Sequence, residues 1–379
     1  MHSACYFESI DDPALTDTVT HWQQQWPTGA CLALVADKSK ACIGELQRCL
    51  NTIGYPLLGA VFPELISYAR FKSKGILLLL ITDLPYYQLI EELPTDNNAL
   101  TSSITALSDK LEPHLNTQST DHALFLIFDS LIPNIGTLLE QLYFNLNDRL
   151  HYFGVNAGSE TFQPGACLFD NDRFCGNGML AILLPNHPGA LIAHNYLLPN
   201  SQLTATSTNS NRINHINGRP AFEVYQELVE AQFDVVITVE NFYAYAVHFP
   251  FGINNHEDEP LVRIPIEVEE DGSLYCVGEV PPGTTLCLLE ALPAGSMDTV
   301  NAIGAHAPLY SGELVLTFYC AGRRLHLDKL AHNELTSLGT RLKPLNVMGA
   351  VSLGEIGNTN CSGKPDFHNA ALVVAPWLT

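Results

Sequence analysis

Short apolar runs alternate with amphipathic stretches through the first 150 residues. The runs that are apolar almost throughout predict buried strands, over residues 31–35, 75–82 and 123–128. The stretches between and after them predict helices, over residues 39–53, 100–111 and 133–146. Ser39 is the expected cap of the first helix, and Gly54 is its expected stop. Strands separated by helices of this length predict crossover connections and a parallel or mixed sheet.

The pattern changes after residue 152, where shorter apolar runs are broken by Gly, Asn, Asp and Pro. This texture is typical of antiparallel strands. Residues 200–219 are rich in Ser, Thr and Asn and predict a loop or an exposed hairpin, and a helix is expected over 220–231. Asp271-Gly272 lies between two apolar runs and is a strong hairpin signal. Helices are expected over 298–305 and 325–338, with strands over 314–320, 347–353 and 370–375.

These elements predict an α/β fold in which two α/β units pack together, with mixed β-sheets sandwiched between helices. Residues 1–29 are polar and are expected to form a peripheral lead-in. The first unit is expected to span residues 30–220 and the second residues 221–379. No short-period repeat is visible in the sequence.

Composition narrows the range of partners. Of 379 residues, 46% are hydrophobic and 15% are charged, and 40 acidic residues against 18 Lys and Arg give a net charge of −22. Such a surface repels nucleic acid and anionic membranes. The longest apolar run is far shorter than the roughly 20 residues of a membrane helix, and no secretory signal is present. We therefore expect a cytoplasmic protein that binds neither nucleic acid nor membrane.

The chain carries few recognisable catalytic motifs. Its ten cysteines form no C-x-x-C pair, and no phosphate-binding loop, nucleophile elbow or H-E-x-x-H sequence occurs. Most of the cysteines are expected to be reduced core residues in a reducing compartment.

His194 lies in an otherwise apolar run, residues 191–196. One interpretation is a core histidine whose ring is satisfied by backbone groups. The other is a ligand to a metal or a haem iron, because neutral imidazole is a common protein ligand for both. The sequence leaves both open, with Tyr196 beside the candidate ligand.

A second group of candidates follows two later strands. Arg323 follows an apolar strand and could bind a carboxylate, a haem propionate or an amino-acid headgroup, or form a structural salt bridge to a glutamate such as Glu355. Glu355 stands between Gly354 and residues 356–357 at the end of a strand and could face a pocket. Cys320 could be an activated thiol with His326 nearby, although a cysteine in this position is more often a core residue.

Several of these segments together resemble the FIST family of bacterial sensory domains. Residues 56–63 are similar to a P-x-x-G-G-x-F-P segment, with Ala60 in place of a glycine. Residues 193–196 are similar to V-A-H-G-W, with Asn195-Tyr196 replacing the Gly-Trp pair. Residues 249–252 and 262–266 resemble the start of the FIST C domain, and residues 320–324 and 354–356 match best.

The resemblance is to the nitric-oxide-sensing haem proteins called NosP. It implies a stand-alone sensor, not an enzyme, that binds haem b non-covalently, takes nitric oxide as its gas ligand and regulates a partner histidine kinase in biofilm signalling. By the same resemblance, His194 would be the iron ligand and Arg323, Glu355 and Tyr196 would line the haem site. His248 and His368 are the next candidates as ligands.

Three alternatives stay open at this stage. The first is a FIST-type sensor that binds a small amino-acid-like metabolite through Arg323 and Glu355, without haem. The second is an enzyme that uses Cys320 as its nucleophile, and the third is a structural adaptor. The sequence names neither the kinase nor the oligomeric state.

Overall fold

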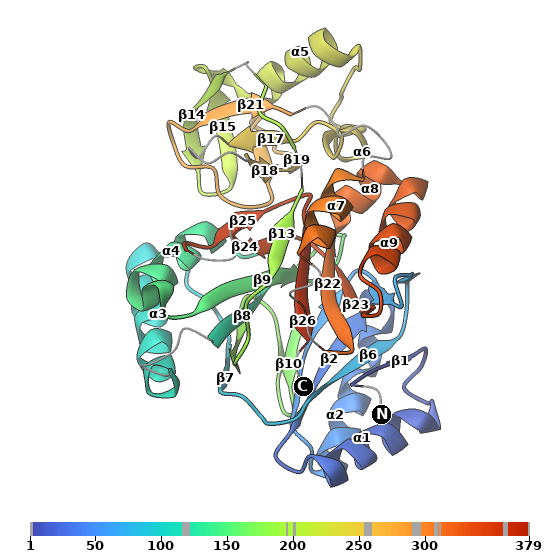
Figure 1. Ribbon diagram of the computed structural model, residues 1–379. Coiled ribbons are helices and arrows are strands. Elements are labelled where there is room, and N and C mark those ends of the chain that lie inside the picture. Colours follow the sequence, from blue (N-terminus) through green and yellow to red (C-terminus); the bar gives the residue numbers. More distant parts are fainter. Residues whose placement is uncertain are drawn as a thin grey trace.

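The computed structural model describes residues 3–115, 122–194, 196–199, 202–253, 260–289, 297–306, 310, 312–358 and 363–377. Most of these residues form a body of three mixed sheets, and an inserted barrel-like sheet stands at one end of it (Figure 1). The α/β class with mixed sheets is confirmed.

The body is built from three repeats of one order of elements. Each repeat begins with an outer strand and a helix. Two central strands follow, which are parallel to each other and are joined by a helical crossover. A hairpin and a returning strand complete the repeat. Repeat 1 comprises β1 (Ala4–Phe7), α1 (Pro13–Gln25), β2 (Ala30–Ala36), η1 (Asp37–Cys42), α2 (Ile43–Ile53), β3 (Leu57–Phe62), β4 (Leu65–Ser67), β5 (Phe71–Lys72) and β6 (Ile76–Ile81).

The other two repeats follow the same order. Repeat 2 comprises β7 (Tyr87–Ile90), α3 (Asn97–Leu111), η2 (Glu112–His114), β8 (His122–Asp129), α4 (Ile135–Leu146), η3 (Asn147–Arg149), β9 (His151–Ala157), β10 (Leu168–Asp170), β11 (Phe174–Cys175) and β12 (Met179–Pro185). Repeat 3 comprises β13 (Leu191–Ala193), α7 (Asp298–Ala305), β22 (Leu314–Cys320), α8 (Ala321–Leu327), α9 (Lys329–Arg341), β23 (Asn346–Ser352), β24 (Glu355–Gly357), β25 (Asp366–His368) and β26 (Leu372–Trp377).

Each repeat gives its hairpin to the sheet of another repeat. Sheet 1 has the order β1-β6-β2-β3-β10-β11, sheet 2 the order β7-β12-β8-β9-β24-β25, and sheet 3 the order β13-β26-β22-β23-β4-β5. The central pairs β2–β3, β8–β9 and β22–β23 are parallel, as the crossover connections require. The three sheets are therefore interlocked, and no repeat completes its sheet alone.

The strand registers show how closely the repeats correspond. Gly59, Gly154 and Gly349 occupy the same position in β3, β9 and β23, each opposite a residue of the imported hairpin. A Cβ atom at Gly59 would collide with the ring of Phe169, and at Gly154 or Gly349 it would collide with the neighbouring main chain. Glycine is needed there because the strands approach closely.

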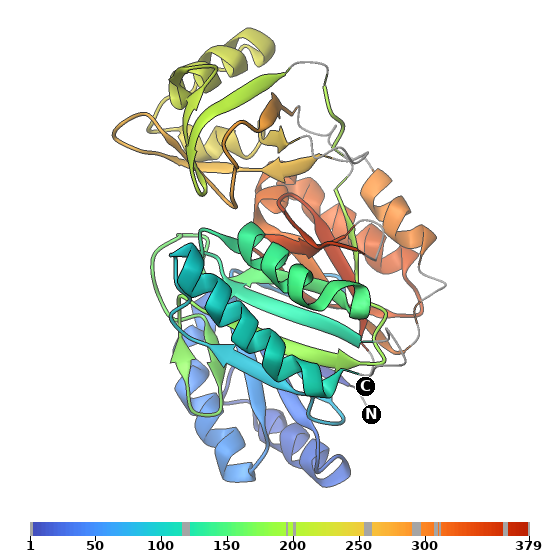
Figure 2. The same ribbon diagram turned by 90° about the vertical axis from the view of Figure 1, so that its left-hand side faces the viewer.

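The inner faces of the sheets share one hydrophobic core. Phe62, Phe125 and Phe318 come from sheets 1, 2 and 3, and the ring centroid of Phe318 lies 5.6 Å from that of Phe62 and 5.9 Å from that of Phe125. The helices cover the outer faces, as α3 and α4 do for sheet 2 (Figure 2). The described helices include none long and apolar enough to span a bilayer.

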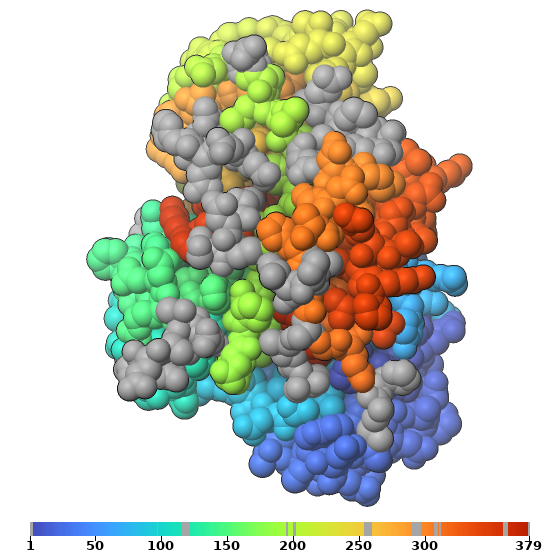
Figure 3. Space-filling view, viewed as in Figure 1, coloured from blue at the N-terminus to red at the C-terminus, as the bar shows by residue number. Residues whose placement is uncertain are grey.

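The barrel-like sheet is inserted between β13 and α7 of repeat 3. It contains β14 (Leu203–Asn209), β15 (Arg212–Ile216), β16 (Arg219–Pro220), α5 (Ala221–Phe233), α6 (Phe242–Ala246), β17 (Phe251–Ile253), β18 (Leu261–Arg263), β19 (Pro265–Val268), β20 (Leu274–Cys276) and β21 (Thr285–Leu288). Its end strands, β18 and β19, are joined through Ile264 alone, so the sheet nearly closes on itself. Figure 3 shows the barrel capping the three-sheet body.

Most of the expected elements are present, with local differences. The hairpins expected within residues 200–219 and at 271–272 are confirmed by the pairing of β14 with β15 and of β19 with β20. Ser39 does not cap α2: it lies inside η1, and its hydroxyl accepts a hydrogen bond from the Gly75 amide. The helix expected over 325–338 is two helices, α8 and α9, which are separated at Asp328, where φ is 48°.

Residues 3–29 are part of the fold rather than a peripheral lead-in. β1 pairs with β6 at the edge of sheet 1, and Asp12 caps α1 by accepting the Ala14 amide. Leu15, Val19 and Trp22 on one face of α1 are fully buried. Their spacing of three and four residues is that of an apolar helix face.

Candidate functional site

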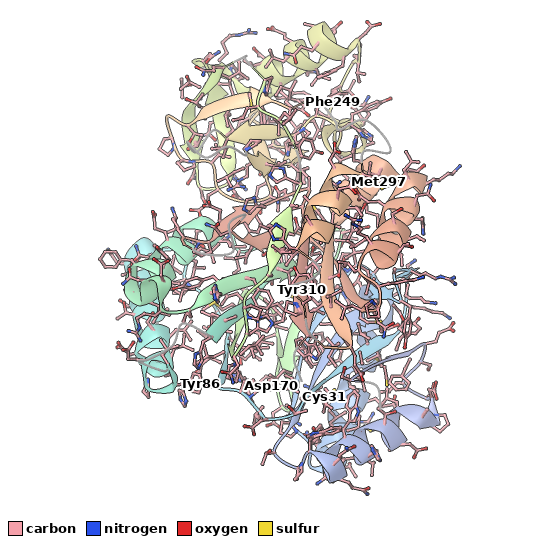
Figure 4. The ribbon with its side chains drawn as sticks, in the orientation of Figure 1. Cys31, Tyr86, Asp170, Phe249, Met297 and Tyr310 are labelled. Carbon is pink, nitrogen blue, oxygen red and sulfur yellow. The ribbon has the colours of Figure 1, made fainter. Side chains whose placement is uncertain are left out.

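A group of buried polar side chains lies where the carboxyl ends of β22 and β23 meet the barrel. We call this group the seam cluster; it consists of His194, Thr299, Tyr319, Cys320, Arg323, Glu334, Ser352, Glu355 and His368. Each member is at most 3% exposed. The boundary between barrel and body runs between the labelled residues Phe249 and Met297 (Figure 4).

Arg323 is the central cation of the cluster. Its Nε and Nη2 donate to the two carboxylate oxygens of Glu334 at 3.0 and 2.6 Å, and the Tyr319 hydroxyl also donates to Glu334. Nη2 donates further to Thr299 Oγ1 at 2.9 Å. Burial opposes the charge of Arg323, but Glu334 outweighs it and the pKa of Arg323 is raised. The guanidinium is therefore fixed and fully charged.

His194 is held by main-chain groups. Its Nδ1 accepts the Tyr196 amide at 3.0 Å, and the ring also has a backbone hydrogen bond with Pro260. The His194 carbonyl accepts from Arg323 Nη1 at 3.3 Å. Burial, followed by the charge of Arg323, lowers the pKa of His194 to about 4. The imidazole is neutral at physiological pH, with one nitrogen acting as acceptor.

His368 lies beside His194, with 5.9 Å between the ring centroids. Burial, followed by the neighbouring charges of His194 and Arg263, lowers the pKa of His368 well below its usual value. Two neutral imidazoles therefore share one buried region. Among the described residues, no group of three or more His, Cys, Asp and Glu side chains is arranged to hold a metal ion.

Glu355 is a fully buried carboxyl group without an ion-pair partner in the described chain. Its Oε1 accepts the Ser352 hydroxyl at 2.6 Å, and its Oε2 accepts the Ala371 amide at 3.4 Å. Burial raises the pKa of Glu355 to about 8, although these hydrogen bonds and one to Cys320 act in the opposite direction. Glu355 is therefore mostly protonated at neutral pH.

Cys320 ends β22 and lies beside Glu355. Its Sγ accepts the Ala370 amide at 3.1 Å. Burial, followed by the charge of Glu355, raises the pKa of the Cys320 thiol. This environment favours the thiol over the nucleophilic thiolate. His326 does not face Cys320: its Nδ1 lies 2.7 Å from Nδ1 of His248.

Beside the seam cluster, the barrel is joined to the body by hydrogen bonds between side chains and main-chain groups. Arg263 of β18 donates to the Phe367 carbonyl at 2.8 Å, and the Ile264 amide donates to Asn369 Oδ1 at 3.0 Å. Tyr196 packs with Ile264 and Cys320 in a small apolar cluster at the same boundary. β18 of the barrel and β25 of the body are therefore in direct contact beside the seam cluster.

The structure brings His194, Tyr196, Arg323 and Glu355 into one region, around Ala370 and Ala371. The salt bridge considered between Arg323 and Glu355 is not formed, because Arg323 is paired with Glu334. Glu334 lies on α9, 11 residues after Arg323, rather than at the end of a strand.

Glu334 could have been found from its position. Ala331, Leu335 and Leu338 mark the buried face of α9, and Glu334 stands on that face at the same spacing. A lone acid on an apolar helix face requires a buried partner. Thr299 and Ser352 carry no comparable signal, because isolated hydroxyls occur throughout the sequence.

Comparison with protein-family models gives two adjacent matches. The FIST N domain matches residues 31–219, and the FIST C domain matches residues 221–358. No curated protein matches the chain. The two models meet between β16 and α5, inside the inserted barrel, and the seam cluster draws residues from both matched regions. The chain therefore belongs to the FIST family, with a FIST N domain followed by a FIST C domain.

Proposed function

We propose that this FIST protein senses a small ligand at the seam cluster and reports it to a partner histidine kinase. The observation that supports the proposal is the burial of Glu355 in neutral form beside two neutral imidazoles, at the boundary of barrel and body. Buried polar groups cost stability, and strongly shifted pKa values gather at functional sites. The hydrogen bonds of Arg263 and Ile264 offer a route from the seam to the barrel.

Haem b, with nitric oxide as its gas ligand, is the ligand that the family resemblance favours. An iron ligand must offer the lone pair of a ring nitrogen. Both sides of the His194 ring have main-chain partners, at Tyr196 and Pro260. As arranged, His194 does not fit an axial ligand, and haem binding would require the segment around Tyr196 to separate from it.

His187 shows the same local geometry at a position outside the seam. Its Nδ1 accepts the Gly189 amide at 3.1 Å, and its Nε2 lies 2.9 Å from the Pro376 carbonyl. Burial lowers its pKa to about 4, as for His194. His187 is a matched control for His194, because it is also buried, has main-chain hydrogen-bond partners and has a pKa of about 4, but it lies outside the seam cluster.

Hemin titration monitored by absorption tests the haem hypothesis. We expect a Soret band with the wild type and with His187→Ala, its loss with His194→Ala, and a shift of the band when nitric oxide is added. A wild type that takes up no hemin contradicts the haem hypothesis. A band retained in His194→Ala contradicts the assignment of His194.

The second candidate ligand is an amino-acid-like metabolite. Glu355 supports it, since a protonated carboxyl group can donate a hydrogen bond to a carboxylate ligand. Arg323 supports metabolite binding less than the sequence suggested, because its guanidinium already forms an ion pair with Glu334. Thermal shift with the free amino acids tests this candidate: we expect one or more to raise Tm in the wild type but not in Glu355→Gln, and no shift with any of them contradicts it.

A further inference from the structure

The repeats create three corresponding junctions between sheets. At each junction, the outer strand of one sheet faces the imported hairpin of the neighbouring sheet: β7 faces β10–β11, β13 faces β24–β25, and β1 faces β4–β5. Because the strand registers correspond, equivalent residues can be compared directly.

An arginine closes the junction of β7 and β11. Arg173 Nη1 donates to the Leu89 carbonyl on the outer edge of β7 at 3.0 Å, and it lies 3.5 Å from Glu91. Its Nε donates to Asp170 at 2.9 Å. Figure 4 labels Asp170 near Tyr86, which immediately precedes β7. The junction of β13 is closed by direct packing, since Gly357 lies against Ile192.

The junction of β1 with the β4–β5 hairpin is an open groove. Its volume is about 680 Å³, and its walls come from β1, the start of α1 and the β4–β5 hairpin. We call it the repeat 1 groove; its lining includes Ala4, Tyr6, Asp12, Tyr68, Arg70 and Lys72. Pockets of this size hold ligands or short segments of chain.

The equivalent arginine is present but has no acidic partner among the residues that the structure describes. By register, Arg70 corresponds to Arg173, Ser67 to Asp170 and Tyr6 to Leu89. Glu8, which corresponds to Glu91, is paired with Lys74 at 2.7 Å instead.

The cations of the groove are consequently not held in ion pairs, although the charge of Lys72 also lowers the pKa of Glu8, after the larger effect of Lys74. Within the described part of the chain, neither Arg70 nor Lys72 belongs to an ion pair, and the Lys72 ammonium lies 5.2 Å over the ring of Tyr6. The one acid of the lining, Asp12, already accepts the Ala14 amide. In a chain with a net charge of −22, two unpaired cations in one groove favour an anionic occupant.

The outer edge of β1 can accept another strand. The Leu80 amide donates to the Ser3 carbonyl, so Ser3, Cys5 and Phe7 direct their main-chain groups toward β6. Main-chain groups alternate in an antiparallel pair, so those of Ala4 and Tyr6 face the groove. β1 is the last strand of sheet 1 on this side. An exposed strand edge is a template for pairing with an extended peptide.

The turn above the groove is conformationally strained. Tyr68 and Ala69, at its centre, have φ values of 49° and 55°, which L-residues rarely adopt. The side chain of Tyr68 is 53% exposed at the tip of the hairpin. Glycine and asparagine are the usual residues of such a turn, and strained positions gather at functional surfaces.

We propose that the repeat 1 groove binds an extended acidic segment of a partner protein, which adds as a strand to β1 while its carboxylates pair with Arg70 and Lys72. The inference gives the proposed signalling role a partner surface, but the groove is distinct from the seam cluster. If hemin and metabolites do not bind, the proposal for the repeat 1 groove still stands. If the peptide does not bind, the ligand hypotheses for the seam cluster still stand.

Fluorescence anisotropy with three labelled peptides tests the proposal on the full chain. The probes are an eight-residue peptide of alternating Glu and Val, its Lys-Val counterpart, and the Glu-Val peptide N-methylated at alternate residues, which removes main-chain donors. We expect only the unmodified Glu-Val peptide to bind. Its addition should also slow hydrogen exchange of the main-chain amides of residues 4–7.

Two double variants separate the groove from general charge effects. R70Q/K72Q should weaken binding of the Glu-Val peptide roughly tenfold or more. R149Q/K364Q makes the same charge change at exposed side chains elsewhere and should leave binding unchanged. Absence of binding by the Glu-Val peptide overturns the proposal. The proposal is also overturned if the N-methylated peptide binds equally well, or if free glutamate competes fully with the Glu-Val peptide. Either result would show that binding does not depend on pairing of a strand with β1.

Discussion

At the residue scale, Arg323 and Glu334 form an ion pair that is almost completely removed from water. Each side chain is 3% exposed, and Tyr319 and Thr299 complete the hydrogen bonding. A buried pair of this kind contributes modestly as a pair, but loss of one partner leaves an uncompensated charge.

Glu334→Gln is therefore expected to lower the free energy of unfolding by about 3–5 kcal/mol. The matched control is Glu112→Gln, which breaks the exposed bidentate pair with Arg149 and should cost less than about 1 kcal/mol. Urea denaturation of both variants provides the measurement. Equal effects would contradict a structural role for the buried pair.

Glu355 makes stability depend on pH in a defined direction. Its pKa in the folded chain is about 8 against an ordinary 4.5, so between these values the folded chain holds a proton that the unfolded chain releases. Stability from Glu355 is therefore complete below about pH 4.5 and is lost as the pH rises toward 8. His194, with a pKa of about 4, acts in the opposite sense and destabilises the fold as the pH falls below 6.5.

Comparison with Glu355→Gln isolates this contribution. Between pH 5 and 8, wild-type stability should fall relative to the variant by about 1 kcal/mol per pH unit. Unfolding curves at several pH values measure the difference. In Glu140→Gln, where the side chain is exposed, the free energy of unfolding should change with pH as it does in the wild type. The same pH dependence in Glu355→Gln would contradict the claim that Glu355 is buried in its neutral form.

At the element scale, the three hairpins differ although their strands correspond. The β4–β5 turn places Tyr68 and Ala69 at positive φ, whereas the β10–β11 turn is stabilised by Asp170, which accepts the amides of Asp172 and Arg173. The strain in the first turn costs stability that an unstrained residue would recover.

Ala69→Gly is expected to raise the free energy of unfolding by about 1 kcal/mol, because glycine adopts positive φ without strain. Ala106→Gly, at an exposed position inside α3, is the control and should lower it by about 1 kcal/mol. Thermal denaturation gives both values. A loss of stability in Ala69→Gly would show that the turn is not strained.

At the scale of the whole molecule, charge and topology act together. The net charge of −22 belongs to a chain that folds into the three-sheet body and the barrel inserted into it. Self-repulsion opposes the compact state, and salt screens it, since the screening length falls from about 30 Å at 0.01 M to about 8 Å at 0.15 M.

Added NaCl over that range should therefore move the urea midpoint of unfolding to a higher concentration. Sucrose at the same osmolality is the control for effects other than screening. An unchanged or lower midpoint in salt would mean that charge repulsion is not a significant destabilising force in this fold.

The local pattern of the sequence predicted much of the secondary structure. The runs that became β2, β6 and β8 are apolar throughout, and such runs predict buried strands whatever surrounds them. The hairpin at Asp271-Gly272 follows from its turn residues. β1 and α1 were missed, because the apolar run of β1 is only four residues long and the three buried apolar residues of α1 stand among polar ones.

The candidate site was predicted only in part. His194, Arg323 and Glu355 stand out because each is a polar residue in an apolar setting, and this can be read along the chain. Of their partners, Glu334 is marked by its place on the apolar face of α9, whereas Ala370 and Ala371 approach through the fold and carry no signal along the chain.

The sequence by itself determined most of the strands and helices, and it marked His194, Arg323 and Glu355 as polar residues in apolar settings, because these features depend on hydrophobic periodicity and local turn chemistry. Only the tertiary structure decided that hairpins are exchanged among three repeats, that Arg323 pairs with Glu334, and that one of three sheet junctions stays open. These features arise from strand registers and from contacts between separate elements, which hydrophobic periodicity and turn residues do not specify.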